Sequence, residues 1–206
     1  MRWRKFGLAG LLAVTPLLVM TSRLPAQGLL VDQASGTLDE VVTTSSQIPD
    51  GQIAQSFTPS FSGVGYVQFS EYVPALPGNN AVNFVVNLRE GAYNGPILSS
   101  TAPVILVNKF TQIGTFYFPA NIPVTPGQLY FFEPVLQSAG FLDVGYKFPS
   151  SYPAGEAWNN GLPSGDASDY WFREGIVVPE PVTIWLLLLG SGVFIWRPRP
   201  EKSSWL

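Results

Sequence analysis

The residues best suited to chemistry lie in one stretch of the sequence, residues 152–173. Among residues typical of exposed loops, it brings together an aromatic ring, two amides and two aspartates: Trp158, Asn159, Asn160, Asp166 and Asp169. An aromatic ring can stack on the C–H face of a sugar, while amide and carboxylate groups bind its hydroxyls. These five residues are therefore a candidate carbohydrate-binding site.

Two other interpretations of this stretch remain open. Ca²⁺ binds several carboxylate and carbonyl oxygens, so Asp166 and Asp169 could hold calcium, although their spacing matches no EF-hand loop. In the plainer interpretation, which we favour, residues 170–172 belong to the last core strand, Trp158 covers the end of the domain, and the aspartates cap turns. On this interpretation the protein carries no cofactor.

The sequence contains few of the residue types on which enzymatic catalysis usually depends. It contains no Cys and no His, which excludes disulfides, thiol nucleophiles, His-based triads and His-ligated zinc. A glycoside hydrolase needs two carboxylates that face each other across a cleft. Paired acids occur at Asp39–Glu40 and at Asp166 with Asp169, but no long loops accompany them. We expect the protein not to be an enzyme, and we keep a small glycoside hydrolase as the third alternative.

The net charge of the central part of the chain bears on which kinds of molecule it can bind. The whole chain has a net charge of −3, but residues 28–178 hold four basic and twelve acidic residues, a balance of −8. Such a surface repels the phosphate backbone of nucleic acids. We therefore expect no nucleic-acid partner.

The candidate site must be positioned by β-strands. In residues 82–89 the side chains alternate between an apolar face and a polar one: Val82, Phe84, Val86 and Leu88 against Asn83, Asn87 and Arg89. This period of two is typical of a half-buried strand. Similar short runs, separated by Gly, Pro, Asn and Ser, predict strands at 55–59, 65–73, 82–89, 104–107, 115–118, 128–135, 142–146 and 169–173. We predict an all-β fold, an antiparallel two-sheet sandwich of the jelly-roll kind over residues 28–175.

The C-terminal segment predicts contact with a membrane. Residues 182–196 are apolar and contain no charge and no proline, and three basic residues follow: Arg197, Arg199 and Lys202. Fifteen helical residues span about 22 Å, less than the roughly 30 Å of a bilayer core, but snorkelling arginines relieve part of the mismatch. The basic residues would hold this end in the cytoplasm. We predict a single transmembrane helix over 182–196 with a basic tail at 197–202; a buried C-terminal core helix is the alternative.

The N-terminus predicts export. Residues 1–26 have a basic start, an apolar run over 6–20 and a small-residue exit, as a signal peptide does. Cleavage is expected after Ala26, with Gly28 as the alternative site; an uncleaved anchor is a further alternative. Both ends of the chain would then start in the cytoplasm and the middle would be exported. Residues 175–178 are predicted to be a short linker.

The order of features in residues 178–206 closely resembles the PEP-CTERM sorting signal of Gram-negative bacteria. The box Pro179-Glu180-Pro181 is followed by the apolar segment and the basic tail. The resemblance implies that a membrane-embedded exosortase recognises the box and processes the tail. It also implies an intermediate anchored in the inner membrane, then a place at the cell surface or in the extracellular matrix of a species that makes exopolysaccharide.

A looser resemblance covers the central domain. The segments 55–59, 126–130, 152–155 and 169–173 resemble extracellular sandwich modules found before PEP-CTERM tails, which are similar in outline to carbohydrate-binding jelly rolls. It implies the sandwich fold more than any ligand. Taking the whole chain together, we predict a non-catalytic structural or binding role in an exopolysaccharide matrix. The alternative is a carbohydrate-binding, lectin-like module. An exposed Trp158 beside free amides and carboxylates would favour the lectin, and a buried Trp158 the structural role.

Overall fold

The computed structural model describes residues 27–38, 44–48, 52–74, 81–107, 111–165 and 168–179. The predicted signal peptide (1–26), the predicted transmembrane helix (182–196) and the tail residues Arg197, Arg199 and Lys202 lie outside these ranges, as do Glu180 and Pro181 of the box. Asp166 also lies outside them. Within the described ranges, the chain forms no helix with the length and apolar character needed to cross a membrane.

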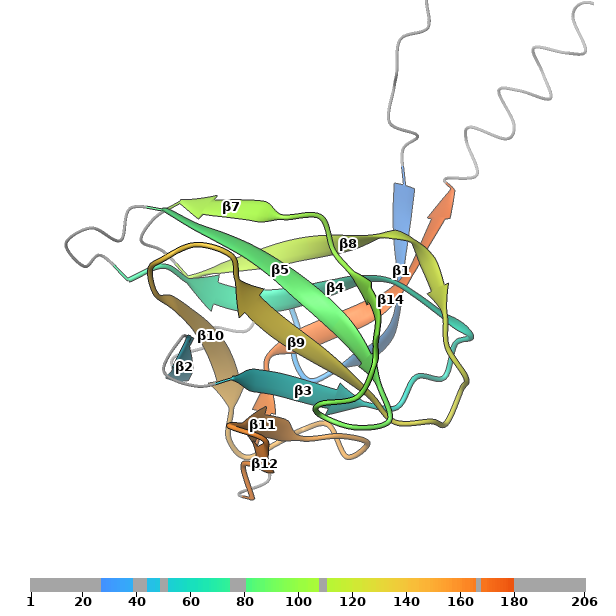
Figure 1. The fold of residues 1–206 in the computed structure, drawn as a ribbon. Coiled ribbons are helices and arrows are strands. Elements are labelled where there is room, and N and C mark those ends of the chain that lie inside the picture. The colour runs from blue at the N-terminus through green and yellow to red at the C-terminus, as the bar shows by residue number, and fades with distance from the viewer. Residues whose placement is uncertain are drawn as a thin grey trace, which may run out of the picture.

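Two antiparallel sheets form the domain (Figure 1). Sheet A contains β1 (Gln27–Ala34), β2 (Thr44–Ile48), β4 (Gly63–Tyr72), β8 (Gln112–Pro123), β10 (Leu142–Lys147), β13 (Asp169–Tyr170) and β14 (Phe172–Pro179). Sheet B contains β3 (Ile53–Phe57), β5 (Ala81–Glu90), β6 (Ile97–Ser100), β7 (Val104–Val107), β9 (Tyr130–Leu136), β11 (Ala157–Asn159) and β12 (Leu162–Pro163). Sheet A runs β1-β14-β4-β10-β13, with β2 beside β10 and β8 beside β4. Sheet B runs β12-β11-β3-β9-β5-β6, with β7 also beside β5.

Aromatic side chains fill the space between the sheets. Phe57 and Phe132 stack within sheet B at 4.2 Å between ring centroids. Phe84 of sheet B meets Phe116 of sheet A edge to face at 4.9 Å, and Phe132 meets Phe172 at 6.3 Å. All five residues are buried. These contacts across the two layers make the domain a packed sandwich, so the all-β prediction is confirmed.

Most predicted strands are present, but their ends and their number differ from the prediction. The predicted strand 169–173 is two elements, because Trp171 separates β13, which pairs with β10, from β14, which pairs with β4 and β1. The strands β1, β2, β6, β11 and β12 were not predicted. The linker predicted at residues 175–178 is wrong, since these residues belong to β14 and pair with Gly28–Val31 of β1.

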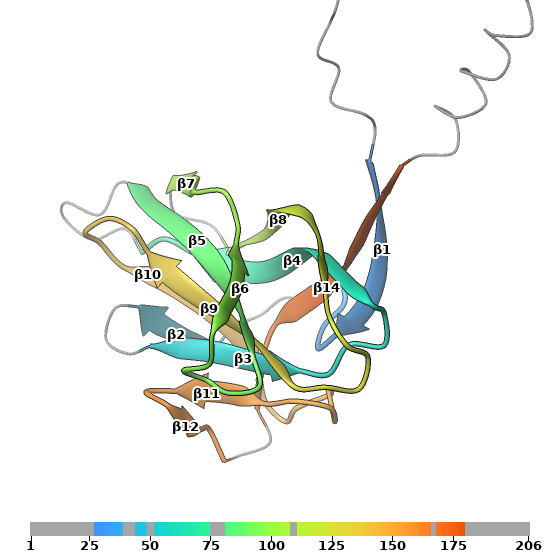
Figure 2. The same ribbon diagram turned by 45° about the vertical axis from the view of Figure 1, so that its right-hand side comes forward.

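The first and last strands form a two-stranded ribbon. Figures 1 and 2 show β1 and β14 lying side by side and projecting beyond the body of the sandwich. Gln27 and Pro179 are Cα partners at its tip. Beyond Gly175, β14 no longer pairs with β4, and the Asn121 side chain hydrogen-bonds its backbone instead. Asn121 Nδ2 donates to the Val177 carbonyl oxygen (3.0 Å), and Asn121 Oδ1 accepts from the Val177 amide (2.9 Å). The described ends of the chain therefore leave the domain at one point.

Candidate functional site

The structure gives Asp169, one of the five predicted site residues, a structural role. Its side chain is fully buried and accepts hydrogen bonds from Gln55 Nε2 (2.9 Å), from Ser150 Oγ and from the Tyr152 amide (3.2 Å). Burial raises the pKa of Asp169, and the hydrogen bonds from Ser150 and Gln55 partly offset this. Because these donors engage both carboxylate oxygens inside the domain, the geometry supports the structural interpretation of Asp169.

Asn159 and Asn160 lie at an exposed hairpin turn. Trp158 pairs with Pro163 and Asn159 with Leu162, which leaves Asn160 and Gly161 as the two turn residues. Both have positive φ, 51° and 79°, as a type I′ turn requires and as the Asn-Gly pair favours. The turn is tied to the rest of sheet B by the Asn160 amide, which donates to the Gln52 carbonyl oxygen at 2.8 Å.

Trp158 belongs to a cluster of three aromatic rings on the outer face of sheet B. Its ring lies nearly parallel to that of Tyr93, at 5.9 Å and 17°, and edge-on to Phe131 at 5.3 Å and 83°. Phe131 is buried, whereas Trp158 and Tyr93 are half-buried. We call Tyr93, Phe131 and Trp158 the aromatic cluster. Trp158 is thus neither free in solvent nor enclosed, and two of the three rings keep part of their surface open.

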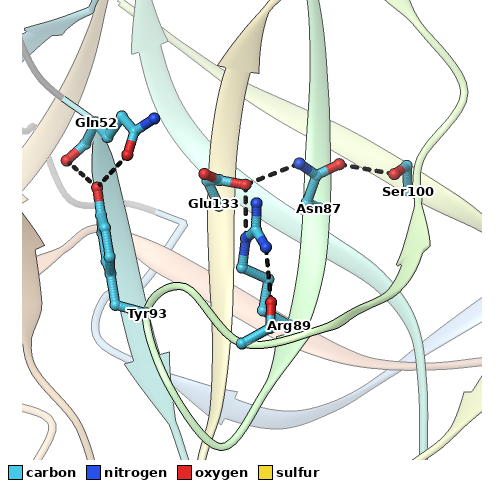
Figure 3. Close-up of polar contacts among 7 residues, drawn as sticks. Gln52, Asn87, Arg89, Tyr93, Ser100 and Glu133 are labelled. Atoms are coloured by element: carbon cyan, nitrogen blue, oxygen red, sulfur yellow. Dashed lines mark hydrogen bonds and ion pairs between the residues drawn. The ribbon is translucent and has the colours of Figure 1, made fainter. Parts of the chain in front are cut away.

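A polar network lies on the same sheet, near Tyr93 of the aromatic cluster (Figure 3). Glu133 Oε2 accepts from Asn87 Nδ2 and from Arg89 Nε, both at 2.8 Å. Ser100 Oγ donates to Asn87 Oδ1 (2.7 Å), and Arg89 Nη1 donates to the Gly95 carbonyl oxygen (2.7 Å). Asn87, Arg89, Ser100 and Glu133 are the polar network. Because the carboxylate and the guanidinium form an ion pair, their opposite charges offset each other.

Gln52 borders both groups, because it contacts Tyr93 and lines the same surface hollow as Asn87, Arg89 and Glu133. The Tyr93 hydroxyl donates to the Gln52 carbonyl oxygen at 2.8 Å and lies 3.2 Å from its side-chain Oε1 (Figure 3). Burial raises the pKa of Tyr93, and the nearby charge of Glu133 adds to the effect. The Tyr93 ring also packs over the hairpin turn, since a Cβ added at Gly161 would lie 3.5 Å from its Cε1. Residues distant in the sequence therefore form one continuous surface.

A surface hollow lies next to this network. Its volume is ≈ 370 Å³, and its lining is Ile48, Gln52, Asn87, Arg89, Glu133, Pro134, Val135 and Leu136. The register explains its place: β3 pairs with β9 only over Tyr130–Phe132, and its first two residues, Ile53 and Ala54, pair with β11 alone. The departure of β3 leaves residues 133–136 of β9 without a neighbour from β3, beside the polar groups of β5.

The lining offers binding groups more than catalytic ones. It contains one carboxylate, that of Glu133, which is held by Arg89 and Asn87. A glycosidase needs two. Among the described residues, moreover, there is no cluster of three or more His, Cys, Asp or Glu side chains. The lining thus combines partly exposed rings nearby with polar groups that hydrogen-bond chiefly to one another, of which Asn87 and Glu133 are buried.

Sequence reasoning found one residue of this surface, Trp158, and missed the others. Asn87 and Arg89 were predicted to face outward, but nothing in the sequence indicated that Glu133, about 45 positions away, lies opposite them. Tyr93 lies in the loop between β5 and β6, where no alternating pattern applies. The signal in the sequence that could have pointed to this surface is the row of polar side chains on one face of the 82–89 strand.

No protein-family model matches this chain, and no curated protein matches it either. Fold and geometry define it as an all-β domain of two antiparallel sheets packed as a sandwich.

Proposed function

We propose that this protein is an exported, non-catalytic β-sandwich that binds a polysaccharide of the extracellular matrix through the outer face of sheet B. One observation carries the proposal: the aromatic cluster and the polar network adjoin on one face, where Arg89 is the Cα partner of Phe131 and Gln52 borders both groups. A lectin-like module needs both kinds of group, because rings stack on sugar C–H faces and polar groups bind hydroxyls. A domain with only a structural role needs neither.

The charges on this face favour an uncharged glycan. Arg89 and Glu133 form a 2.8 Å ion pair, so the network presents hydrogen-bonding groups with little net charge. The domain as a whole is acidic and would repel an anionic polymer. The open shape of the hollow also suits an internal segment of an extended chain better than the enclosed end of one.

The mode of delivery rests on the terminal segments. The resemblance of residues 178–206 to PEP-CTERM signals supports export, anchoring of an intermediate in the inner membrane, and processing by an exosortase-type enzyme, with Pro179, Glu180 and Pro181 as the recognised box. The final place would be the cell surface or matrix of a Gram-negative bacterium. The pairing of Gln27 with Pro179 supports this route, since both segments predicted to enter the membrane would adjoin the same end of the domain.

Delivery and binding are tested separately. Changing Glu180→Ala should leave export intact but stop removal of the tail, so that full-length protein accumulates in the inner membrane; tail removal at the normal rate would contradict the sorting role. For binding, an array of neutral and acidic glycans probed with the purified chain should give signals on neutral polysaccharides. An array without any signal would favour the structural role.

A further inference from the structure

A second feature of the domain, remote from the aromatic cluster, is the carboxylate of Glu174. This residue lies in β14 and is fully buried. Neither of its carboxylate oxygens makes a hydrogen bond of normal geometry among the described residues, and the backbone of Gln33 favours the charged form only in part. A carboxylate removed from water without a partner is costly, and nearly all buried polar groups in folded proteins are bonded. Glu174 therefore needs something that the polypeptide around it does not supply.

The surroundings of Glu174 are rich in oxygen. Its Cα partner on β1 is Gln33, and the residue before that, Asp32, is the extra residue of a β-bulge. The Asp32 carboxylate is fixed by the amides of Ser60 and Phe61, both 2.7 Å from its Oδ2. Gln33 Nε2 lies 3.2 Å from Asp32 Oδ1 and 2.5 Å from Ser60 Oγ. Two carboxylates, one side-chain amide and one hydroxyl thus come from β1, β14 and the loop after β3.

The electrostatics of Asp32 and Glu174 also indicate that a positive charge is missing beside them. Burial raises the pKa of Glu174 to about 9, and the charge of Asp32 adds to the rise; the backbone of Gln33 offsets it only in part. No basic side chain contributes to the balance. A proton on Glu174 would remove the charge, but a buried carboxylic acid then needs an acceptor for its O–H, and the described part of the chain provides none in hydrogen-bonding position.

We infer that Asp32 and Glu174, with the side-chain oxygens of Gln33 and Ser60, form a Ca²⁺ site between β1 and β14. A cation satisfies both carboxylates at once. All the candidate ligands are oxygens, which hard cations prefer, and Ca²⁺ tolerates the irregular geometry of such a mixed set better than Mg²⁺, which demands a near-ideal octahedron. The Gln33 amide would turn over to present Oε1 in place of Nε2.

The site lies within reach of solvent. A hollow of ≈ 550 Å³ opens beside it, lined by Ser60, Phe61, Ser62, Gly63, Asn121, Pro123, Pro126 and Ile176. Ser60 and Phe61 hold Asp32, and Ile176 follows Glu174 by two residues on the same side of β14. An ion and its remaining waters could enter here. The location differs from the calcium interpretation of Asp166 and Asp169, because the Asp169 oxygens are already engaged by Gln55, Ser150 and Tyr152.

The experiment compares thermal unfolding of the full-length chain in detergent, stripped with EGTA, as CaCl₂ or MgCl₂ is added. Extracellular calcium modules bind with Kd values of about 10⁻⁴–10⁻³ M. At about ten times such a Kd, Ca²⁺ should raise the Tm by about 3–6 °C, and Mg²⁺ should raise it less. Tb³⁺ provides a direct readout, since tyrosines near the site, including Tyr152, would sensitise its luminescence.

The matched variants are Glu174→Gln, Asp32→Asn and Glu71→Gln. Glu71 is a second buried carboxylate with an unpartnered oxygen, but the causes of its shifted pKa include no neighbouring acid. The response to Ca²⁺ and Tb³⁺ should disappear in Glu174→Gln and weaken in Asp32→Asn, while Glu71→Gln responds like the wild type. Glu174→Gln keeps the shape of the side chain and carries no charge, so it should fold. A wild-type chain that neither shifts its Tm nor binds Tb³⁺, or a Glu174→Gln chain that responds fully, would overturn the inference.

Discussion

Gln27 and Pro179 are antiparallel partners at the tip of the β1–β14 ribbon. The first described residue of the chain is thus held against the last one. Because Gln27 directly follows the predicted signal peptide and Pro179 opens the predicted sorting box, the two processing sites would meet at one end of the domain. This arrangement links the fold to the proposed route of export.

The ribbon predicts where the signal peptide is cut. Cleavage after Ala26 preserves all of β1, whereas cleavage after Gly28 removes the pairs Gln27–Pro179 and Gly28–Val178. We expect the exported protein to begin at Gln27, as mass spectrometry of its N-terminal peptide would show. A mature chain that begins at Leu29 would show that the outer end of the ribbon is dispensable.

The junction of the ribbon with sheet A depends on Gly65. A Cβ at this position would collide with Asn121 Oδ1 and lie 2.8 Å from the Val177 nitrogen. Gly65→Ala should therefore lower the free energy of unfolding by about 2–4 kcal/mol, and Asn121→Ala by about 1 kcal/mol through its two lost hydrogen bonds. Denaturant unfolding measures both.

The double variant tests whether the two residues act together. With the Asn121 amide removed, an alanine at position 65 meets one obstacle fewer, so the double change should cost less than the sum of the single ones. Strict additivity would mean that the amide does not occupy the space above Gly65.

The buried Glu71 predicts a pH dependence of stability. Burial raises its pKa from 4.5 to about 8, and a hydrogen bond from Gln112 lowers it only in part. Between these values the folded state keeps a proton that the unfolded chain has lost, so this group's contribution is fully present below about pH 4.5 and is lost as pH rises to about 8. In EGTA, the Tm of the wild type should fall between pH 5 and pH 8.

Glu71→Gln should reduce this fall, because glutamine cannot titrate and keeps nearly the same shape. The control is Glu90→Gln, at an exposed position of the neighbouring sheet, which should leave the pH dependence of Tm as it is in the wild type. If the profiles of Glu71→Gln and the wild type ran parallel, Glu71 would not be the titrating group.

The sandwich could be predicted because its signal is local. Val82, Phe84, Val86 and Leu88 alternate with polar residues and all four are buried, as a strand with one face on a core requires. The run over 104–107 was predicted with the bounds that β7 has. Such patterns depend on neighbours two positions apart and need no knowledge of the partner strand.

The contacts that the sequence did not predict depend on which strands pair and in which register. That Asn87 lies opposite Glu133 follows from the pairing of β5 with β9, which the sequence leaves open. The strand β1 shows no alternation because it carries a bulge at Asp32 and has a neighbour on one side only, and its partner β14 comes at the far end of the domain. Because the pairing of β14 with β1 is not visible in the sequence, nothing distinguished Glu174 from the other eleven acidic residues of the central part of the chain.

The most direct test of the central claim measures binding of a neutral polysaccharide by variants of the aromatic cluster. Isothermal titration with the best glycan of the array should give a Kd that rises about tenfold or more in Trp158→Ala and in Tyr93→Ala, since truncating a Trp or Tyr hot spot costs about 2 kcal/mol or more of binding free energy. Phe148→Ala is the matched control, because Phe148 is an exposed aromatic outside the face and should leave the Kd unchanged. Circular dichroism confirms that each variant is folded. Folded Trp158→Ala and Tyr93→Ala proteins that bind as tightly as the wild type, or an equal loss in Phe148→Ala, would contradict the account.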